Sequence, residues 1–163
     1  MAQEYSFDVV SQFDRQELVN AVNQAQREIA TRYDFKDTGA SIDLGESEIT
    51  LNGPSDFKMK AMLDVLQGKL VKRQLSLKIL KPGPIEPAAK GTVRQKLELV
   101  QGIDDELART LVKQIKLVSP KVQPRIQGDT IRVSSRDKDL LQQVIASLKA
   151  SEAAVPLQFI NYR

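Results

Sequence analysis

Cationic and amide side chains recur at alternate positions of one predicted hairpin, between residues 121 and 133. One side of this hairpin is apolar and carries Val122, Pro124, Ile126, Ile131 and Val133. The other side is polar and carries Lys121, Gln123, Arg125, Gln127, Thr130 and Arg132. Because successive strand residues point to opposite faces, these polar side chains share one surface. Arginine and lysine there are suited to phosphate, which arginine binds in a bidentate manner.

A second predicted strand, over residues 93–99, places Arg94 and Lys96 on its polar side. We therefore predict that Arg94, Lys96, Lys121, Gln123, Arg125 and Arg132 take part in nucleotide binding. The sequence leaves open whether the two strands form one surface or two. The alternative is an ordinary solvent-exposed sheet face, since any uncovered antiparallel face in a soluble protein is polar.

The segment Arg32-Tyr33-Asp34-Phe35-Lys36-Asp37 interleaves aromatic and cationic side chains. An aromatic ring can stack on a base while a neighbouring cation holds the phosphate. Arg32, Phe35 and Lys36 are therefore further candidates for nucleotide binding. The alternative is a surface loop whose aromatic rings pack over the end of a helix.

The sequence contains no Cys, His or Trp. Without Cys and His there is no disulfide, no thiolate nucleophile, no Ser-His-Asp triad and no zinc site of the usual kind. The acidic run Asp104-Asp105-Glu106 stands at a predicted helix start, where carboxylates cap N–H groups and favour the helix dipole. We expect a protein without catalytic activity, metal or cofactor; a carboxylate-based hydrolase is the remaining enzymatic alternative.

The usual glycine-rich phosphate loops are also absent. The eight glycines include no pair spaced two or five residues apart, so neither G-x-G-x-x-G nor G-x-x-x-x-G-K-[ST] occurs. A phosphate would have to be held by side chains or by helix N-termini.

The elements that position these side chains occur twice along the chain. In the first half the patterns predict a strand at 5–10, a helix after Asp14, a hairpin at 42–51, a helix after Ser55 with its apolar stripe at 62–70, and a strand at 75–80. In the second half they predict a strand at 93–99, a helix after Asp104, a hairpin at 122–133, a helix around 140–148 and a strand at 157–162. A proline-rich and glycine-containing stretch, Lys81–Pro87, separates the halves and is predicted to be irregular.

This duplicated β-α-β-β-α-β order predicts an α+β fold with two ferredoxin-like domains. Each would have a four-stranded antiparallel sheet with both helices on one face. We place the first repeat at 1–81, a linker at 82–90 and the second repeat at 91–163.

Charge and composition indicate a soluble, cytoplasmic protein with no membrane span. The formal net charge is +3, with 41% hydrophobic and 28% charged residues. Residues 1–85 carry a net −1 and residues 86–163 a net +4. A basic half suits a partner that bears phosphate.

Several segments, taken in order, resemble the YajQ family of small bacterial proteins. They are Phe7-Asp8-Val9-Val10-Ser11, Arg32-Tyr33-Asp34-Phe35-Lys36, Lys121-Val122-Gln123, Ile126-Gln127-Gly128-Asp129, Arg132-Val133 and Pro156-Leu157-Gln158-Phe159 with Asn161. The turn Ser134-Ser135-Arg136-Asp137 departs from the more basic, Gly- and Lys-containing turn expected there.

The resemblance implies that the two domains exchange their first strands, residues 5–10 and 92–100. It also implies nucleotide or nucleic-acid binding, with cyclic di-GMP signalling as the purpose. We expect the ligand to be cyclic di-GMP, GTP or ATP, and the protein to act as a regulator through a protein partner. The alternative is an RNA- or DNA-binding accessory module that uses the basic open sheet face. An RNA-recognition module of the stacking type is disfavoured, because its central strands need aromatic residues where this chain has Thr50, Thr130 and Arg132.

Overall fold

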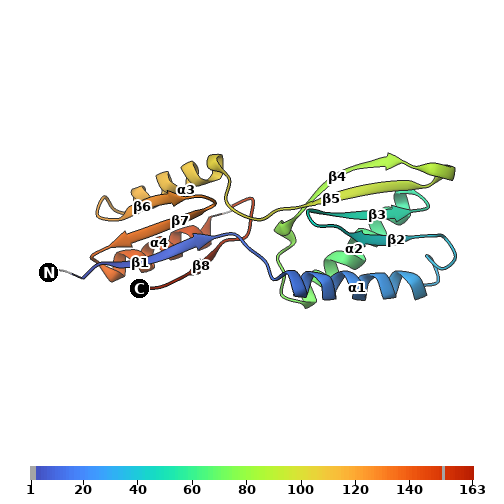
Figure 1. The fold of residues 1–163 in the computed structure, drawn as a ribbon, viewed down its shortest axis with the longest axis horizontal. Helices are drawn as coiled ribbons and strands as arrows, with labels where there is room; N and C mark the ends of the chain where they lie inside the picture. Colours follow the sequence, from blue (N-terminus) through green and yellow to red (C-terminus); the bar gives the residue numbers. More distant parts are fainter. Residues whose placement is uncertain (1–2, 152) are drawn as a thin grey trace. The chain divides into compact units, whose positions relative to one another are not determined.

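The fold is described from a computed structural model that covers residues 3–151 and 153–163 (Figure 1). The chain divides into two compact units. The central unit comprises residues 13–100, and the C-terminal unit comprises residues 101–163 with the described part of residues 1–12. Each unit contains one four-stranded antiparallel sheet and two α-helices. No helix in the described ranges is long and apolar enough to cross a membrane.

The central unit has its sheet strands in the order β2-β3-β5-β4. Its elements are α1 (Arg15–Thr31), β2 (Ser41–Leu44), β3 (Glu48–Gly53), α2 (Asp56–Lys72), the 3-10 turn Leu77–Ile79, β4 (Leu80–Pro87), the 3-10 turn Ala89–Gly91 and β5 (Val93–Leu99). The C-terminal unit has the order β6-β7-β1-β8. Its elements are β1 (Tyr5–Val10), α3 (Asp105–Val118), β6 (Gln123–Gln127), β7 (Thr130–Ser135), α4 (Lys138–Ala150) and β8 (Gln158–Ile160).

The first strands of the two repeats are exchanged, as the family resemblance implies. β1 pairs antiparallel with β7 and β8, whereas β5 pairs with β3 and β4. Each of these strands is central in the sheet that receives it (Figure 1). The compact units therefore do not follow the order of the chain. By residue count the central unit carries a net +2 and the C-terminal unit a net +1, so the charge difference between the sequence halves disappears.

The alternating patterns place the apolar strand residues against the helices. In the C-terminal unit, Phe7 and Val9 of β1 join Ile131 and Val133 of β7 in one core with α3 and α4. In the central unit, Leu97 of β5 is buried in the other core. Full burial of such side chains contributes about 1.5–3 kcal/mol each. Each exchanged strand thus completes the hydrophobic core of its host unit.

The predicted helix starts are confirmed. The Asp14 side chain accepts hydrogen bonds from the backbone N–H groups of Gln16 and Glu17, at 2.9 and 3.2 Å. The Asp104 side chain accepts one from the N–H of Leu107 at 2.8 Å. Both aspartates therefore act as N-caps, which satisfy otherwise unpaired donors of the first turn.

The predicted strand at 75–80 and the irregular linker from residue 82 are both wrong. Residues Leu77–Ile79 form a 3-10 turn, and the strand is β4, Leu80–Pro87. β4 lies at the edge of its sheet, where a proline that lacks an N–H group is tolerated. Its pairing with β5 shifts register between Pro82 and Ile85, and the Gln95 side chain donates to the Gly83 carbonyl across this irregularity, at 2.9 Å.

A polar cluster around the buried Asp8 ties β1 to its host sheet. The Arg132 guanidinium on β7 donates to the Asp8 carboxylate on β1 at 3.0 and 3.4 Å. The Asn161 side chain donates to the same carboxylate at 2.8 Å. Asp8 is 7% exposed, so its charge depends on these donors. The Arg132 guanidinium, with help from Asn161, holds the pKa of Asp8 below its usual value although burial acts in the opposite direction.

We predict that Asp8→Asn lowers the free energy of unfolding by about 1–2 kcal/mol at neutral pH, because it removes the charge that pairs with Arg132. A lowered folded-state pKa stabilises the fold above the unfolded pKa, and this stabilisation is lost as the pH falls through the folded value. The difference in the free energy of unfolding between wild type and variant should therefore shrink once the pH falls below 3.8, the ordinary pKa of an aspartate. Urea unfolding at several pH values measures it.

Glu86→Gln is the matched control for this experiment. Its carboxylate lies 4.0 Å from Arg94 in an exposed pair, and removing such a pair should change stability by less than about 0.5 kcal/mol. An Asp8→Asn effect as small as the control, or independent of pH, contradicts the role given to Asp8.

Candidate functional site

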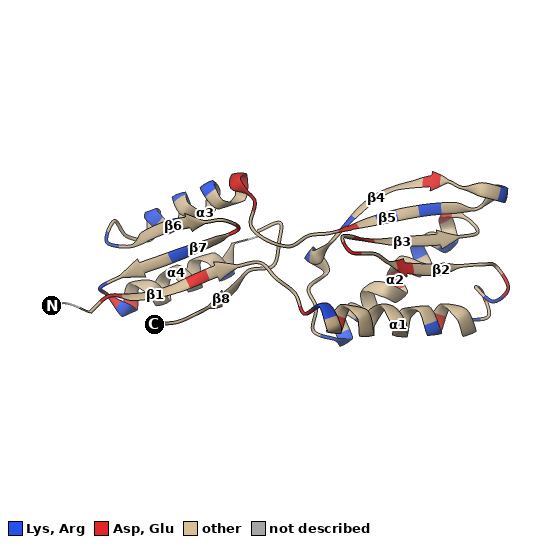
Figure 2. Cartoon of the chain, in the orientation of Figure 1, with Lys and Arg blue, Asp and Glu red and all other residues tan. Residues whose placement is uncertain are grey.

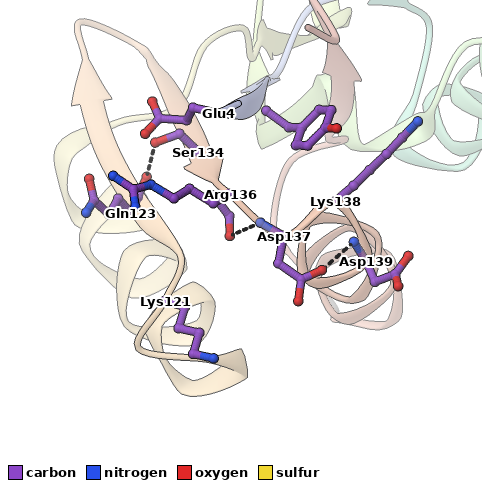
Figure 3. Close-up of a pocket in the computed structure, with 10 residues that line it drawn as sticks. Glu4, Lys121, Gln123, Ser134, Arg136, Asp137, Lys138 and Asp139 are labelled. Carbon is purple, nitrogen blue, oxygen red and sulfur yellow. Dashed lines mark hydrogen bonds between the residues drawn. The ribbon is translucent and has the colours of Figure 1, made fainter. Parts of the chain in front are cut away.

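A cavity of about 760 Å³ lies in the C-terminal unit, where β7 ends and α4 begins (Figure 3). We refer to it as the β7–α4 cavity. Its lining comes from the segment that leads into β6, the residues around the start of β1, the end of β7 and the turn into α4. The lining residues are Glu4, Tyr5, Lys121, Gln123, Ser134, Ser135, Arg136, Asp137, Lys138 and Asp139.

Local hydrogen bonds shape the turn that forms one wall of this cavity. The Asp137 N–H donates to the Ser135 hydroxyl at 3.1 Å. The Asp137 carboxylate in turn accepts from the N–H groups of Asp139 and Leu140, at 2.9 and 3.4 Å, and so caps α4. Because Asp137 already occupies these helix donors, an anion in the cavity would be held by the cationic side chains instead.

Three of the lining side chains are cations: Lys121, Arg136 and Lys138. All three residues are exposed, and none forms an ion pair within 4.0 Å with any described residue. Lys138 lies 5.9 Å from the centre of the Tyr5 ring. Figure 3 shows these side chains reaching out from different parts of the wall. They are available to an anionic ligand without first breaking an internal pair.

The same cavity also offers hydrogen-bond acceptors. Glu4 and Asp139 contribute carboxylates, and Gln123 contributes an amide. With Asp137 included, the lining carries as many carboxylates as cations. Over residues 3–151 and 153–163, no group of three or more carboxylates is arranged to hold a metal ion. The mixture suits a ligand that has both phosphate groups and N–H or O–H donors.

The structure separates the residues predicted from the sequence. Lys121 and Gln123 line the β7–α4 cavity. Arg125 and Arg132 are directly opposite each other on β6 and β7, on the sheet face away from the helices. Arg125 is exposed, whereas Arg132 is occupied by Asp8, which raises the pKa of the guanidinium.

Arg94 and Lys96 lie in the other unit, on β5. They are opposite Asn52 and Thr50 of β3. Arg94 has Glu86 as its neighbour at 4.0 Å. This outward face also carries Glu98 on β5, Glu48 on β3 and Asp43 on β2. The face is of mixed charge and is not a basic surface (Figure 2).

Only one of the two aromatic rings in the loop is packed, as the structural alternative predicts for both. Phe35 is only 2% exposed and belongs to the core of the central unit. The Arg32 guanidinium lies 5.1 Å from the centre of the Phe35 ring and also donates to Asp34 at 2.9 and 2.8 Å. Lys36 is exposed, and Tyr33 is 97% exposed. A base therefore has no access to the Phe35 ring in this conformation.

Sequence reasoning missed Arg136, Lys138 and Glu4 as lining residues. One local signal locates the turn into α4: Asp137 stands just before the apolar stripe of that helix, which is the pattern of an N-cap. No local pattern brings Glu4 to the turn, because its position depends on the exchange of β1.

These features define a class of protein: two ferredoxin-like units that exchange their first strands. The chain belongs to the YajQ family, because the family described as "Nucleotide-binding protein YajQ-like" matches residues 5–163. It is 53% identical over 163 residues to a protein of Trichodesmium erythraeum and 51% identical over 165 residues to one of Roseiflexus sp.. A protein of Desulfitobacterium hafniense is 48% identical over 163 residues. Each of these comparisons covers 100% of both chains, and all three relatives carry the name "Nucleotide-binding protein".

We predict that Phe35→Ala lowers the free energy of unfolding by about 3–5 kcal/mol, the usual cost of removing a buried phenylalanine. Tyr33→Ala, two residues away and exposed, should change it by less than about 0.5 kcal/mol. Urea or thermal unfolding of the two variants measures both effects. Unchanged stability of Phe35→Ala, together with lost affinity for a nucleotide, would instead make Phe35 a ligand-binding residue.

Proposed function

We propose that this chain is a non-enzymatic nucleotide-binding protein whose ligand binds in the β7–α4 cavity. The observation that carries the proposal is the set of three exposed cations, Lys121, Arg136 and Lys138, around a cavity of about 760 Å³. This volume lies within the roughly 300–1,000 Å³ of small-molecule sites. The names of the relatives point to the same class of ligand.

In this proposal the cations hold the phosphate groups. Arg136 offers a planar, bidentate donor, and the two lysines offer point charges that adapt to the phosphate position. The Glu4 carboxylate and the Gln123 amide accept hydrogen bonds from the ribose hydroxyls or from the base. The nucleotide is then recognised by several placed groups and not by charge alone.

The proposed ligands are purine nucleotides: cyclic di-GMP, GTP or ATP. A regulatory role fits the site, because its wall combines the start of β1 with the turn before α4. A ligand there contacts both the exchanged strand and its host unit. It would stabilise the docked state of β1 by mass action, and a protein partner could respond to that state.

The second candidate function is RNA or DNA binding by the open sheet face of the C-terminal unit. The exposed Arg125 beside Gln123 and Gln127 favours it. The ion pair between Arg132 and Asp8 disfavours it, because one of the two arginines on this face is already neutralised.

We predict saturable binding of at least one of cyclic di-GMP, GTP and ATP in calorimetric titrations. Arg136→Ala and Lys138→Ala should each weaken it about tenfold or more, as expected for loss of a charge-assisted hydrogen bond. Lys113→Ala is the matched control, since it removes an exposed charge from α3 of the same unit outside the cavity. It should leave the affinity unchanged.

A short RNA titrated at low and moderate salt separates the two functions. If only RNA binds, if its affinity falls steeply with salt and if Arg125→Ala weakens it, the open face is the site. The nucleotide proposal is then wrong. Turnover of GTP or ATP by the purified chain would contradict the non-enzymatic assignment.

A further inference from the structure

A shift in strand register occurs where the chain leaves β8. Asp8 of β1 is opposite Ile160, but Ser6 exchanges two backbone hydrogen bonds with Arg163, at 3.2 and 2.9 Å. The two residues from Asp8 to Ser6 therefore match three residues from Ile160 to Arg163. The extra residue is accommodated at Asn161, which has a φ of +56°, a conformation that asparagine tolerates better than most residues. Its side chain is held by the Asp8 carboxylate.

This bulge reverses the direction of Tyr162. In a regular strand, Tyr162 would share a face with Ile160, because side chains alternate. The inserted residue instead turns Tyr162 to the face of the sheet that packs against the helices, the helix side. There the centre of its ring lies 6.2 Å from the centre of the Phe7 ring. Tyr162 is nevertheless 61% exposed. The Tyr162 ring therefore covers part of the helix side without being buried in the core. Bulges commonly redirect a side chain in this way.

A second cavity of about 200 Å³ lies beside this ring. We call it the Tyr162 slot. Its wall combines five aromatic or aliphatic side chains with four polar ones. The lining residues are Tyr5, Ser6, Phe7, Lys138, Leu141, Gln142, Ile145, Tyr162 and Arg163. Tyr5 and Lys138 also line the β7–α4 cavity, so the slot adjoins it.

The slot and the cavity differ in the chemistry that each can recognise. The cavity is lined mainly by charged and hydroxyl side chains, which suit phosphate and ribose. The slot offers the rings of Tyr5 and Tyr162, with the buried Phe7 beneath them, and these rings suit the apolar faces of a flat ring. At about 200 Å³ it is smaller than the roughly 300 Å³ of the smallest usual sites for a whole ligand. It fits one part of a larger molecule.

We propose that the Tyr162 slot binds the purine base of a nucleotide whose phosphate lies in the β7–α4 cavity. The inference rests on the proposed function and adds the position of the base. Tyr162 packs on one face of the base, Gln142 on α4 provides an amide for its edge, and Lys138 lies between base and phosphate. Lys138 is placed for this because it lines both spaces.

The test compares ligands with and without a base. Cyclic di-GMP, GTP and GMP are titrated calorimetrically into the full chain, with ribose 5-phosphate as the ligand that lacks a base. Tyr162→Ala should weaken the nucleotides about tenfold, the usual effect of losing one aromatic stacking partner, and leave ribose 5-phosphate unchanged. Arg136→Ala should weaken all of them. Tyr33→Ala, which removes an exposed tyrosine from the other unit, is the matched control and should have no effect.

Tyrosine fluorescence gives an independent readout. The chain has no Trp and only three tyrosines, Tyr5, Tyr33 and Tyr162. In a Tyr33→Phe variant the emission comes from the two tyrosines that line the slot. A stacked base should quench it, with inner-filter absorption corrected, and ribose 5-phosphate should not.

The outcomes separate the two proposals. If nucleotides bind and Arg136→Ala weakens them, but Tyr162→Ala has no effect and tyrosine emission is unchanged, the base lies elsewhere and only this inference fails. If no nucleotide binds the folded wild type, the proposed function fails and this inference fails with it. Tyr162→Ala should remain folded because the side chain is mostly exposed, which far-UV circular dichroism checks.

Discussion

The docking of β1 in the sheet of the C-terminal unit is the constraint on which the rest of that unit depends. In the described part of the chain, β1 connects β7 to β8, so without it the sheet would separate into the β6–β7 hairpin and an isolated β8. Burial of Phe7 and Val9 drives the docking, while Asp8 specifies its register. A slip of one residue would bury the Asp8 carboxylate in the core and expose Phe7, which the ion pair with Arg132 opposes.

The same strand connects folding to the candidate site. Glu4 and Tyr5 at its start line the β7–α4 cavity, and Phe7 packs beneath Tyr162. The Asp8 carboxylate holds Asn161, whose bulge directs Tyr162 to the helix side. A strand that belongs to the first repeat therefore supplies or orients side chains in both cavities, and a ligand that fills them favours the exchanged arrangement over one with β1 released.

Much of the fold can be predicted from the sequence because local patterns determine it. Asp14 and Asp104 mark helix starts through their own hydrogen bonds, and alternation places Ile131 and Val133 toward the helices. The exchange itself has no such signal. The helix-facing positions of β1 are apolar, and those of β5 are apolar except for Gln95, so alternation alone does not assign either strand to a sheet. β4 was missed because its prolines count against a strand, although they are tolerated at a sheet edge. The sequence also does not locate the cavity, because the cationic turn at Arg136 lies near Glu4 only when the first strands are exchanged. Of the residues predicted to bind a nucleotide, only Lys121 and Gln123 line the cavity.

The exchange also changes the electrostatic argument about the ligand. The net +4 of residues 86–163 suggests a basic domain, but β5 carries Arg94 and Lys96 into the central unit, where they share a sheet face with several carboxylates. The C-terminal unit that remains has a net charge of +1, and its cavity has equal numbers of cations and carboxylates. Long-range attraction of a polyanion is weak under these conditions. Affinity must then come from a few cations at short range and from contacts with the uncharged part of the ligand, which favours a single nucleotide held in a defined orientation over an extended nucleic acid.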